Sequence, residues 1–415
     1  PNIELLIYKI VLYGILIAVP IIVFVLIRKS LHNRQKMIWF SNLQFTTLRI
    51  LVPKNNEKTP LAAEQMFAAL HGIFQKESSF QDYFSFEIAS REKYIQFYIH
   101  APIHLKDFVE GQIYSQYPTA EIAEVDDYTL EEKENILSGD LKLAGTELAL
   151  TNLDVYPIKT FLNFEVDPLA GITGVLSKVE KTEEIWIQIL VKPVSDKWQA
   201  KGIGHVKTMK AGTASQVGFV ASLFGYFLRF LSGVFATILT GETPPSSQAK
   251  EKEDVKLSGT QEEGLKGVET KGTKLGFETK IRVITFAPDQ YTAQSKLLST
   301  VASFKQFNLL NLNGFQSGAV HHDTDFYELY RWRAFLDTGF VLNAEELASI
   351  FHLPNITVET PSIVWAGSKK GEPPSNLPIE ENVPAGELTV FAQTNFRHMS
   401  HKFGMKINDR RYHMY

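Results

Sequence analysis

The sequence contains no cysteine among its 415 residues. Without thiols, the chain has no disulfide framework, no zinc–thiolate site, no iron–sulfur cluster and no thiol nucleophile. An excess of charge of one sign is also missing, because 42 Lys and Arg stand against 46 Asp and Glu and give a formal net charge of -4. This balance provides no overall attraction to nucleic acid.

Recognisable catalytic motifs are missing as well. No GxSxG, HExxH, DxDxDG or GxGxxG pattern occurs, and neither does a GxxxxGK[ST] loop. Without that loop, no nest of backbone N–H groups and no lysine is available for the phosphates of a nucleotide. His321, His322, Asp323 and Asp325 are the densest candidates for metal ligation, but no distant third ligand accompanies them. We therefore expect no catalytic residue, no metal site and no cofactor in this chain.

What the sequence does contain is enough apolar material for real cores. Hydrophobic residues make up 44% of the chain, unlike a disordered protein. At about 100–200 residues per domain, the length indicates two or three folded units.

An uncharged apolar run occupies residues 10–27. Its length matches a hydrocarbon layer of about 30 Å and predicts a transmembrane helix in which Pro20 is tolerated. A buried helix and a signal-peptide core are the alternatives, but no small-residue cleavage site follows the run. The residues predicted to span the membrane include Ile10, Val11, Leu12, Ile15, Leu16, Pro20, Phe24 and Ile27.

Basic residues after this run predict its orientation. Arg28, Lys29, Arg34 and Lys36 follow it, whereas only Lys9 precedes it. The positive-inside rule then places the rest of the chain in the cytoplasm. We expect a single-pass protein of the bacterial inner membrane, with the lipid bilayer as a partner.

The next part of the chain predicts an α+β fold built from a duplicated βαββαβ, ferredoxin-like unit. Pro60 and Pro168 each begin a helix after a strand, and Ala101-Pro102 and Ala287-Pro288 stand at equivalent strand-to-helix junctions. One larger α+β domain is the alternative. The expected organisation is an anchor at 1–36, a first unit at 37–145, a second unit at 146–320 and a helix-and-strand segment at 321–415.

The second unit carries an insertion at 197–276, in which an amphipathic helix is expected at 215–240 and a disordered linker at 241–275. The helix lies in a membrane interface, spans the membrane or is buried in protein. A spanning helix would separate two strands that are expected to pair, which favours the interfacial position. The expected membrane-interface residues are Phe219, Leu223, Phe227, Arg229 and Phe230.

Three stretches resemble a known family. They lie at residues 304–315 (FKQFNLLNLNGF), 342–354 (LNAEELASIFHLP) and 403–415 (FGMKINDRRYHMY). They are similar to the N-terminal part of TraG-like and HerA/FtsK-like ATPases related to type IV secretion and conjugative coupling, of a subgroup common in ultrasmall bacteria. In that family the terminal strand leads directly into the phosphate-binding loop, which this sequence does not contain.

The resemblance implies a noncatalytic, membrane-anchoring and assembly region of a translocase ATPase, which mounts the motor at the cytoplasmic membrane face. It also implies a homo-oligomer, a hexamer, with an ATPase domain in cis or in trans and with DNA or protein cargo met only indirectly. ATP and Mg are expected only if a motor domain follows, and Arg410, Arg411 and His413 would then contact a nucleotide or a neighbouring subunit. A stand-alone membrane scaffold or adaptor is the alternative function.

Overall fold

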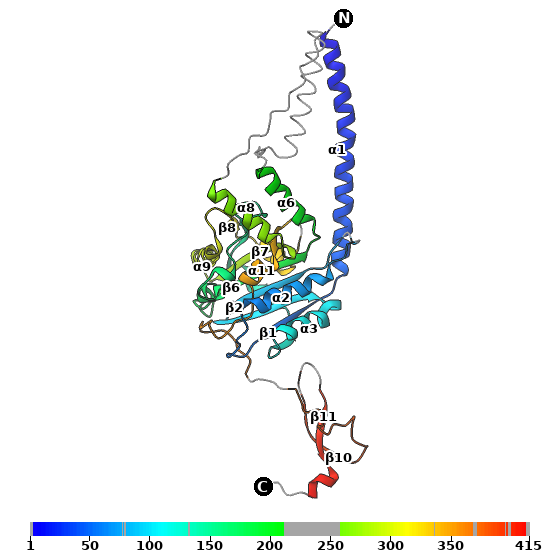
Figure 1. The fold of residues 1–415 in the computed structure, drawn as a ribbon, viewed down its shortest axis with the longest axis vertical. Coiled ribbons are helices and arrows are strands. Elements are labelled where there is room, and N and C mark those ends of the chain that lie inside the picture. The colour runs from blue at the N-terminus through cyan, green and yellow to red at the C-terminus, as the bar shows by residue number, and fades with distance from the viewer. Residues whose placement is uncertain are drawn as a thin grey trace.

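The computed structural model describes residues 3–76, 78, 80–131, 133–210, 258–335, 337–367, 372–394, 396 and 400–411. A single antiparallel sheet of nine strands forms the centre of this part of the chain (Figure 1), in the order β4-β1-β3-β2-β6-β7-β5-β8, with β9 also paired to β7. The architecture is therefore α+β.

The first half of the sheet has βαββαβ connectivity. Its strands are β1 (Phe45–Leu51), β2 (Phe84–Arg91), β3 (Tyr94–Pro102) and β4 (Glu121–Val125), with α2 (Pro60–Leu70) after β1 and α3 (Lys106–Gln116) after β3. Pro60 begins α2, where its fixed φ suits the first helical turn. The turn between β2 and β3 uses Glu92 and Lys93 at φ 48° and 71°.

The second half repeats this connectivity. Its strands are β5 (Lys142–Leu150), β6 (Glu184–Pro193), β7 (Gly276–Ala287) and β8 (Phe315–His321), with α5 (Pro168–Leu176) after β5 and α9 (Gln290–Ser303) after β7. The first of these strands begins and ends earlier than the sequence predicts. The two halves share one sheet, because β2 pairs with β6 from Phe84↔Val191 to Ser90↔Ile185, a lateral contact that the tandem units of the prediction did not include.

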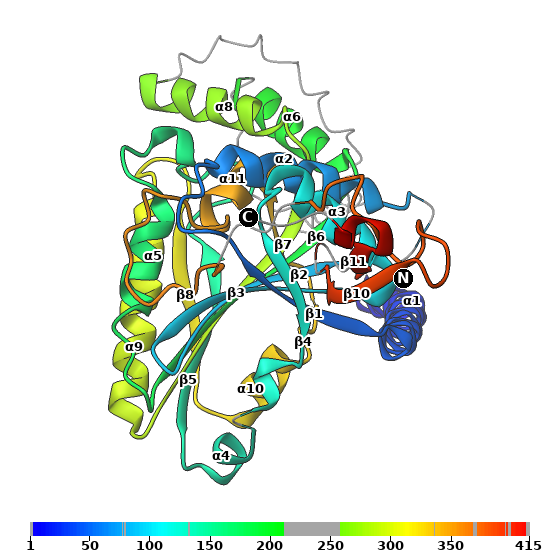
Figure 2. The ribbon, with the colours of Figure 1, turned by 90° about the horizontal axis from the view of Figure 1, so that it is seen from below.

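The two faces of the sheet are covered differently. The helices α2, α3, α5, α9 and α11 (Ala344–Ile350) pack on one face over the main apolar core. On the opposite face lie α4 (Lys133–Ser138) and α10 (Thr324–Arg331), as Figure 2 shows. They cover a smaller core that is rich in aromatic side chains, four of them tyrosine. We call this side the open face.

The N-terminal helix α1 (Ile3–Asn42) contains the apolar run and continues without interruption through Arg28, Lys29, Arg34 and Lys36. Trp39 and Phe40, near its end, pack against Tyr83 and Phe335 of the main body. Among the described residues, no helix combines the length and the apolar character that crossing a bilayer requires. This finding corrects two predictions, the transmembrane helix within residues 1–36 and the single-pass inner-membrane location.

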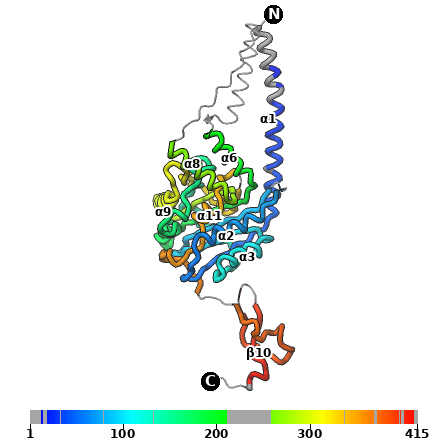
Figure 3. Tube along the Cα trace, viewed as in Figure 1, coloured from blue at the N-terminus to red at the C-terminus, as the bar shows by residue number. Residues whose placement is uncertain are grey.

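Part of the predicted disordered linker is a helix. The segment α8 (Gly259–Lys271) begins with a capping box between Ser258 and Gln261. It lies beside α6 (Lys197–Lys210), as Figure 3 shows, and buries Leu265 and Val268 against Val206. These apolar contacts account for the order that composition alone did not predict. Residues 211–257, with the predicted amphipathic helix and its five interface residues, lie outside the described part.

The predicted C-terminal segment 321–415 is divided. Strand β9 (Phe340–Asn343) pairs with β7, and α11 packs into the main core, so these elements belong to the main body. Asn343 caps α11 in a capping box with Glu346, which confirms the predicted cap. A separate hairpin, β10 (Leu388–Gln393) with β11 (Lys402–Lys406), follows, and a short 3-10 helix (Ile407–Arg411) ends the described chain.

Candidate functional site: the pocket between α1 and α10

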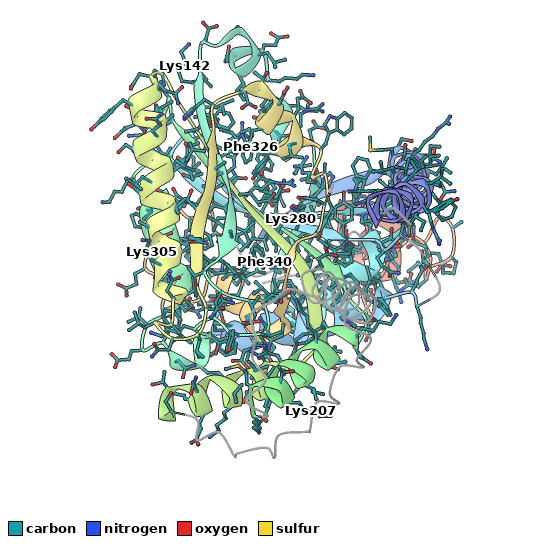
Figure 4. The ribbon with its side chains drawn as sticks, turned by 90° about the horizontal axis from the view of Figure 1, so that it is seen from above. Lys142, Lys207, Lys280, Lys305, Phe326 and Phe340 are labelled. Atoms are coloured by element: carbon teal, nitrogen blue, oxygen red, sulfur yellow. The ribbon has the colours of Figure 1, made fainter. Side chains whose placement is uncertain are left out.

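Helix α10 is held on the open face by apolar side chains and a cap. Asp323 accepts a hydrogen bond from the backbone N–H of Phe326 and so caps the helix. Phe326 lies over β5 at Gly145, where any Cβ would collide with the ring. Figure 4 labels Phe326 on α10 and Lys280 on β7. The helix ends at Arg331, and Arg333 then takes a positive φ of 48°, which turns the chain back over the sheet.

The carbonyl groups at and just after the end of α10 receive side-chain donors from four parts of the chain. We call residues 331–335, which begin with the last residue of α10, the clasp. The donors are Gln188 to Tyr330 O (2.9 Å), Tyr83 to Arg333 O (2.9 Å), Arg282 to Ala334 O (2.6 Å) and Lys36 to Phe335 O (2.5 Å). Since two of these donors are arginine and lysine, they also complement the negative end of the helix dipole.

Arg333 itself reaches back into the sheet. Its Nε lies 3.0 Å from Oε1 of Glu87, and its Nη2 lies 3.1 Å from Oε2. Asp127 accepts a further hydrogen bond from the same guanidinium, with its Oδ1 2.9 Å from Nη2. Arg333 and Glu87 are both buried, with 1% and 0% of their side chains exposed. Burial alone would raise the pKa of Glu87, but the charge and hydrogen bonds of Arg333 hold that pKa below its usual range.

Every remaining acceptor direction of Glu87 is also occupied. Tyr128 donates to Oε2 at 2.8 Å, and Gln188 and Ser85 donate to Oε1. A buried ion pair with this many hydrogen bonds is rigid, because any movement would leave a charge unpaired in a medium of low dielectric constant. We call Glu87, Asp127, Tyr128, Gln188 and Arg333 the buried network.

A cavity of about 740 Å³ lies beside the clasp, between it and the end of α1. Its walls are mainly apolar and aromatic, with Trp39, Phe40, Tyr83 and Trp332 among them, and Arg333 and Asp127 reach it from the buried network. Trp332 is 56% exposed at the rim. The α1–α10 pocket therefore combines aromatic rings, an arginine and a rigid floor.

The structure places few of the predicted site residues together. Lys36 lies in the α1–α10 pocket, whereas Arg28, Lys29 and Arg34 lie exposed along α1. Arg410 and Arg411 lie in the 3-10 helix after β11, and His413 lies outside the described residues. Within the described ranges, no group of three or more metal-ligating side chains occurs.

The buried network was not predicted, although a signal for it exists. Glu87 stands within FSFEIAS and Arg282 within KIRVITFA, where a charge interrupts a strand of high β propensity. Charged residues are almost never fully buried unless paired. Each of these charges would have indicated a buried partner of opposite sign, but the two residues do not pair with each other. Glu87 pairs with Arg333, which comes from just after the end of α10, and Arg282 pairs with Glu147.

His100 provides a pH-dependent test of this site. It lies at the pocket with its Nδ1 2.9 Å from the Thr47 hydroxyl and its ring stacked on Phe45. Burial and the charge of Arg333 lower the pKa of His100 to about 3 from 6.5. The unfolded chain therefore takes up this proton at a higher pH than the folded chain, and stability falls as pH decreases below 6.5.

Between pH 6.5 and 5.5, we expect the His100→Gln variant to lose about 1 kcal/mol less stability than the wild type. Urea unfolding at these two pH values measures the difference, and the other histidines cancel because both proteins contain them. Equal losses in the two proteins would mean that His100 is protonated as readily when folded as when unfolded.

Comparison with known proteins gives a family but no described activity. No curated protein matches the chain. The profile of one family, "Domain of unknown function (DUF8128)", matches residues 41–366, which span the whole sheet and all the residues of the buried network. The chain belongs to the DUF8128 family.

Proposed function

We propose that this chain is a noncatalytic assembly region of a secretion- or conjugation-type translocase ATPase, and that it forms a homo-oligomer through α1 and the α1–α10 pocket. The motor connection rests on the resemblance of residues 304–315, 342–354 and 403–415 to that family. The assembly role rests on the surface of α1 and on the pocket at its end.

The observation that carries the proposal is the apolar surface of α1. Seven consecutive residues, 21–27, are exposed and apolar, and seven residues make almost two helical turns, so apolar side chains point in every direction. A helix that is apolar on all sides needs cover. Among the side chains of α1 that the structure describes, the exposed apolar ones are Leu12, Tyr13, Leu16, Val19, Ile21, Ile22, Val23, Phe24, Val25, Leu26, Ile27, Leu31, Met37 and Ile38.

A second copy of the chain is the cover that fits best. It supplies a helix of the same length and apolar character, and α1 stands clear of the sheet over most of its length (Figure 1), where a partner helix has access. The exposed Met37 and Ile38 continue this surface to the rim of the α1–α10 pocket. Closed symmetric oligomers are the usual outcome of such self-association.

The pocket has the composition of an interface hot spot. Trp, Tyr and Arg carry most of the binding energy in protein interfaces, and Trp39, Trp332, Tyr83 and Arg333 all line it. The buried network fixes Arg333 before any partner arrives, which reduces the entropy lost on association. In the buried network, the charged groups of Glu87 and Asp127 are paired with Arg333. This pairing supports a structural rather than a catalytic role for these residues.

The test measures mass in solution. We expect the wild type to have the mass of a hexamer of 46.9 kDa chains, and V23E combined with F24E to give a monomer, because each buried carboxylate would cost several kcal/mol. Multi-angle light scattering measures both. The matched control is Y291E combined with L298E, since Tyr291 and Leu298 are large apolar residues that are also exposed, on α9, and this variant should keep the wild-type mass.

A monomeric wild type would contradict the assembly role. If that monomer also sedimented with phospholipid vesicles, lipid rather than a second chain would cover α1. The motor connection has its own test. The coding sequence downstream of Tyr415 should encode a GxxxxGK[ST] loop, whereas a stop codon there would favour a stand-alone scaffold.

A further inference from the structure

A second cavity lies on the open face of the sheet, away from α1. It measures about 300 Å³ and is formed where β1 and β3 meet the loop after β4. Arg49 comes from β1, Tyr94, Gln96 and Tyr98 come from β3, and Asp126 comes from the loop. We call it the β1–β3 groove. Most of its lining is polar, in contrast to the α1–α10 pocket.

The two arginines of this groove differ in whether a carboxylate pairs with them. Arg91 is neutralised, because its Nε lies 3.0 Å from Glu184 and its Nη2 lies 2.7 Å from Glu131. Arg49 has no ion pair with a described residue, and its Nε is buried without a hydrogen-bond partner there. A buried donor without an acceptor is unfavourable, because it has given up its hydrogen bonds to water. The groove therefore contains a cationic fork whose acceptor is missing.

The side chains around Arg49 add a second donor and a ring. Tyr98 lies beside Arg49 in register and donates its hydroxyl to Oε1 of Gln96 at 2.9 Å, so that the Gln96 amide N–H₂ is available as a donor. Tyr94 is 56% exposed at the mouth of the groove. Burial raises the pKa of Tyr98 to about 12, so its hydroxyl stays protonated and adds no charge near Arg49.

We infer that the β1–β3 groove binds a small oxyanion, a carboxylate or a phosphate group, with the Arg49 guanidinium and the Gln96 amide as its donors. Carboxylate and phosphate oxygens both match the fork of a guanidinium and form charge-assisted hydrogen bonds with it. The volume of about 300 Å³ holds such a group together with a small attached moiety. Glu92 and Asp126 also line the groove, and their charges weaken the attraction.

The acidic residues make the inference testable in both directions. If an anion binds, removal of a nearby carboxylate must strengthen binding. If the groove instead binds a cation, the same change must weaken it. Glu92 is exposed in the turn between β2 and β3, so E92Q leaves the fold of the chain intact.

Isothermal titration calorimetry with inorganic phosphate, and separately with acetate, measures the affinity of the wild-type chain at low ionic strength. We expect R49Q to weaken binding of the preferred anion at least about tenfold, because a charge-assisted pair is lost. K207Q is the control, since Lys207 is a cation exposed on α6 outside the groove, and it should bind like the wild type. E92Q should bind about two- to fivefold more tightly.

Absence of binding by both anions would overturn the inference, and so would an R49Q variant that is folded by circular dichroism and binds like the wild type. Weaker binding by E92Q would also overturn it. The phosphate and acetate arms distinguish the source of the oxyanion. None of these results depends on oligomeric state, so the groove and the proposed assembly role can fail separately.

Discussion

Replacing Arg333 with methionine is expected to lower the free energy of unfolding by about 3–5 kcal/mol, because it leaves the buried carboxylate of Glu87 without its counter-charge. The loss is large because Glu87 is fully buried and Arg333 gives it two of its hydrogen bonds. The same change frees Asp127 and removes the hydrogen bond to Arg331 O. Chemical denaturation of the purified variant measures the effect.

Arg331 provides the matched control. It lies two residues away and pairs with Glu328 on the same helix, with part of both side chains exposed. We expect R331M to cost no more than about 1 kcal/mol, as partly exposed pairs do. Similar losses for R333M and R331M would mean that the buried network contributes nothing beyond an ordinary surface pair.

Replacing Lys271 with methionine is expected to cost a similar amount, about 3–5 kcal/mol. Its Nζ lies 3.0 Å from Oε2 of Glu346, and neither side chain is exposed. Glu346 also accepts hydrogen bonds from the backbone N–H groups of Ile158 and Asn343. The pair therefore joins α8, the start of α11 and the segment after β5, and its loss affects all three.

The cost of K271M should depend on pH. Burial raises the pKa of Glu346 despite the nearby Lys271, and removal of the cation raises it further. An acid whose folded pKa lies above its unfolded pKa destabilises the fold above the unfolded value of about 4.5, and this penalty disappears at lower pH. We therefore expect the difference between K271M and the wild type to shrink as pH decreases toward 4.

Lys210 is the control for this experiment. It pairs with Glu269 and so joins α6 to α8, with more than half of both side chains exposed. K210M should change stability by less than about 1 kcal/mol at every pH. A loss for K271M that is equally small, or one that grows at low pH, would contradict the buried pair.

Local patterns were sufficient to predict much of the secondary structure. The proline junctions at Pro60 and Pro168 mark real helix starts, and Asn343 caps a real helix. Each of these signals operates within four residues of its effect. The helix α8 escaped prediction because its order comes from Leu265 and Val268 packing on Val206, a contact that composition does not reveal.

Long-range contacts account for the other features of the fold that the sequence did not predict. The pairing of β2 with β6, which joins the two halves, brings together residues about 100 positions apart. The prediction of a transmembrane helix came from the apolar run alone, whereas α1 is one long helix whose end packs on the sheet. The α1–α10 pocket depends on Lys36 and Phe335 meeting across 299 positions, which no local pattern encodes.

If α1 of one chain packs against α1 of another, the absence of cysteine from the sequence allows a direct test by cross-linking. A single cysteine introduced as V23C should form a disulfide-linked dimer on mild oxidation of the purified chain, because the two helices would hold the thiols close together. The control L298C, on the exposed side of α9, should remain monomeric on a non-reducing gel. Equal cross-linking of V23C and L298C would contradict packing of α1 against α1. The same conclusion would follow if no cysteine, placed in turn at each of residues 19–27, formed a cross-linked dimer.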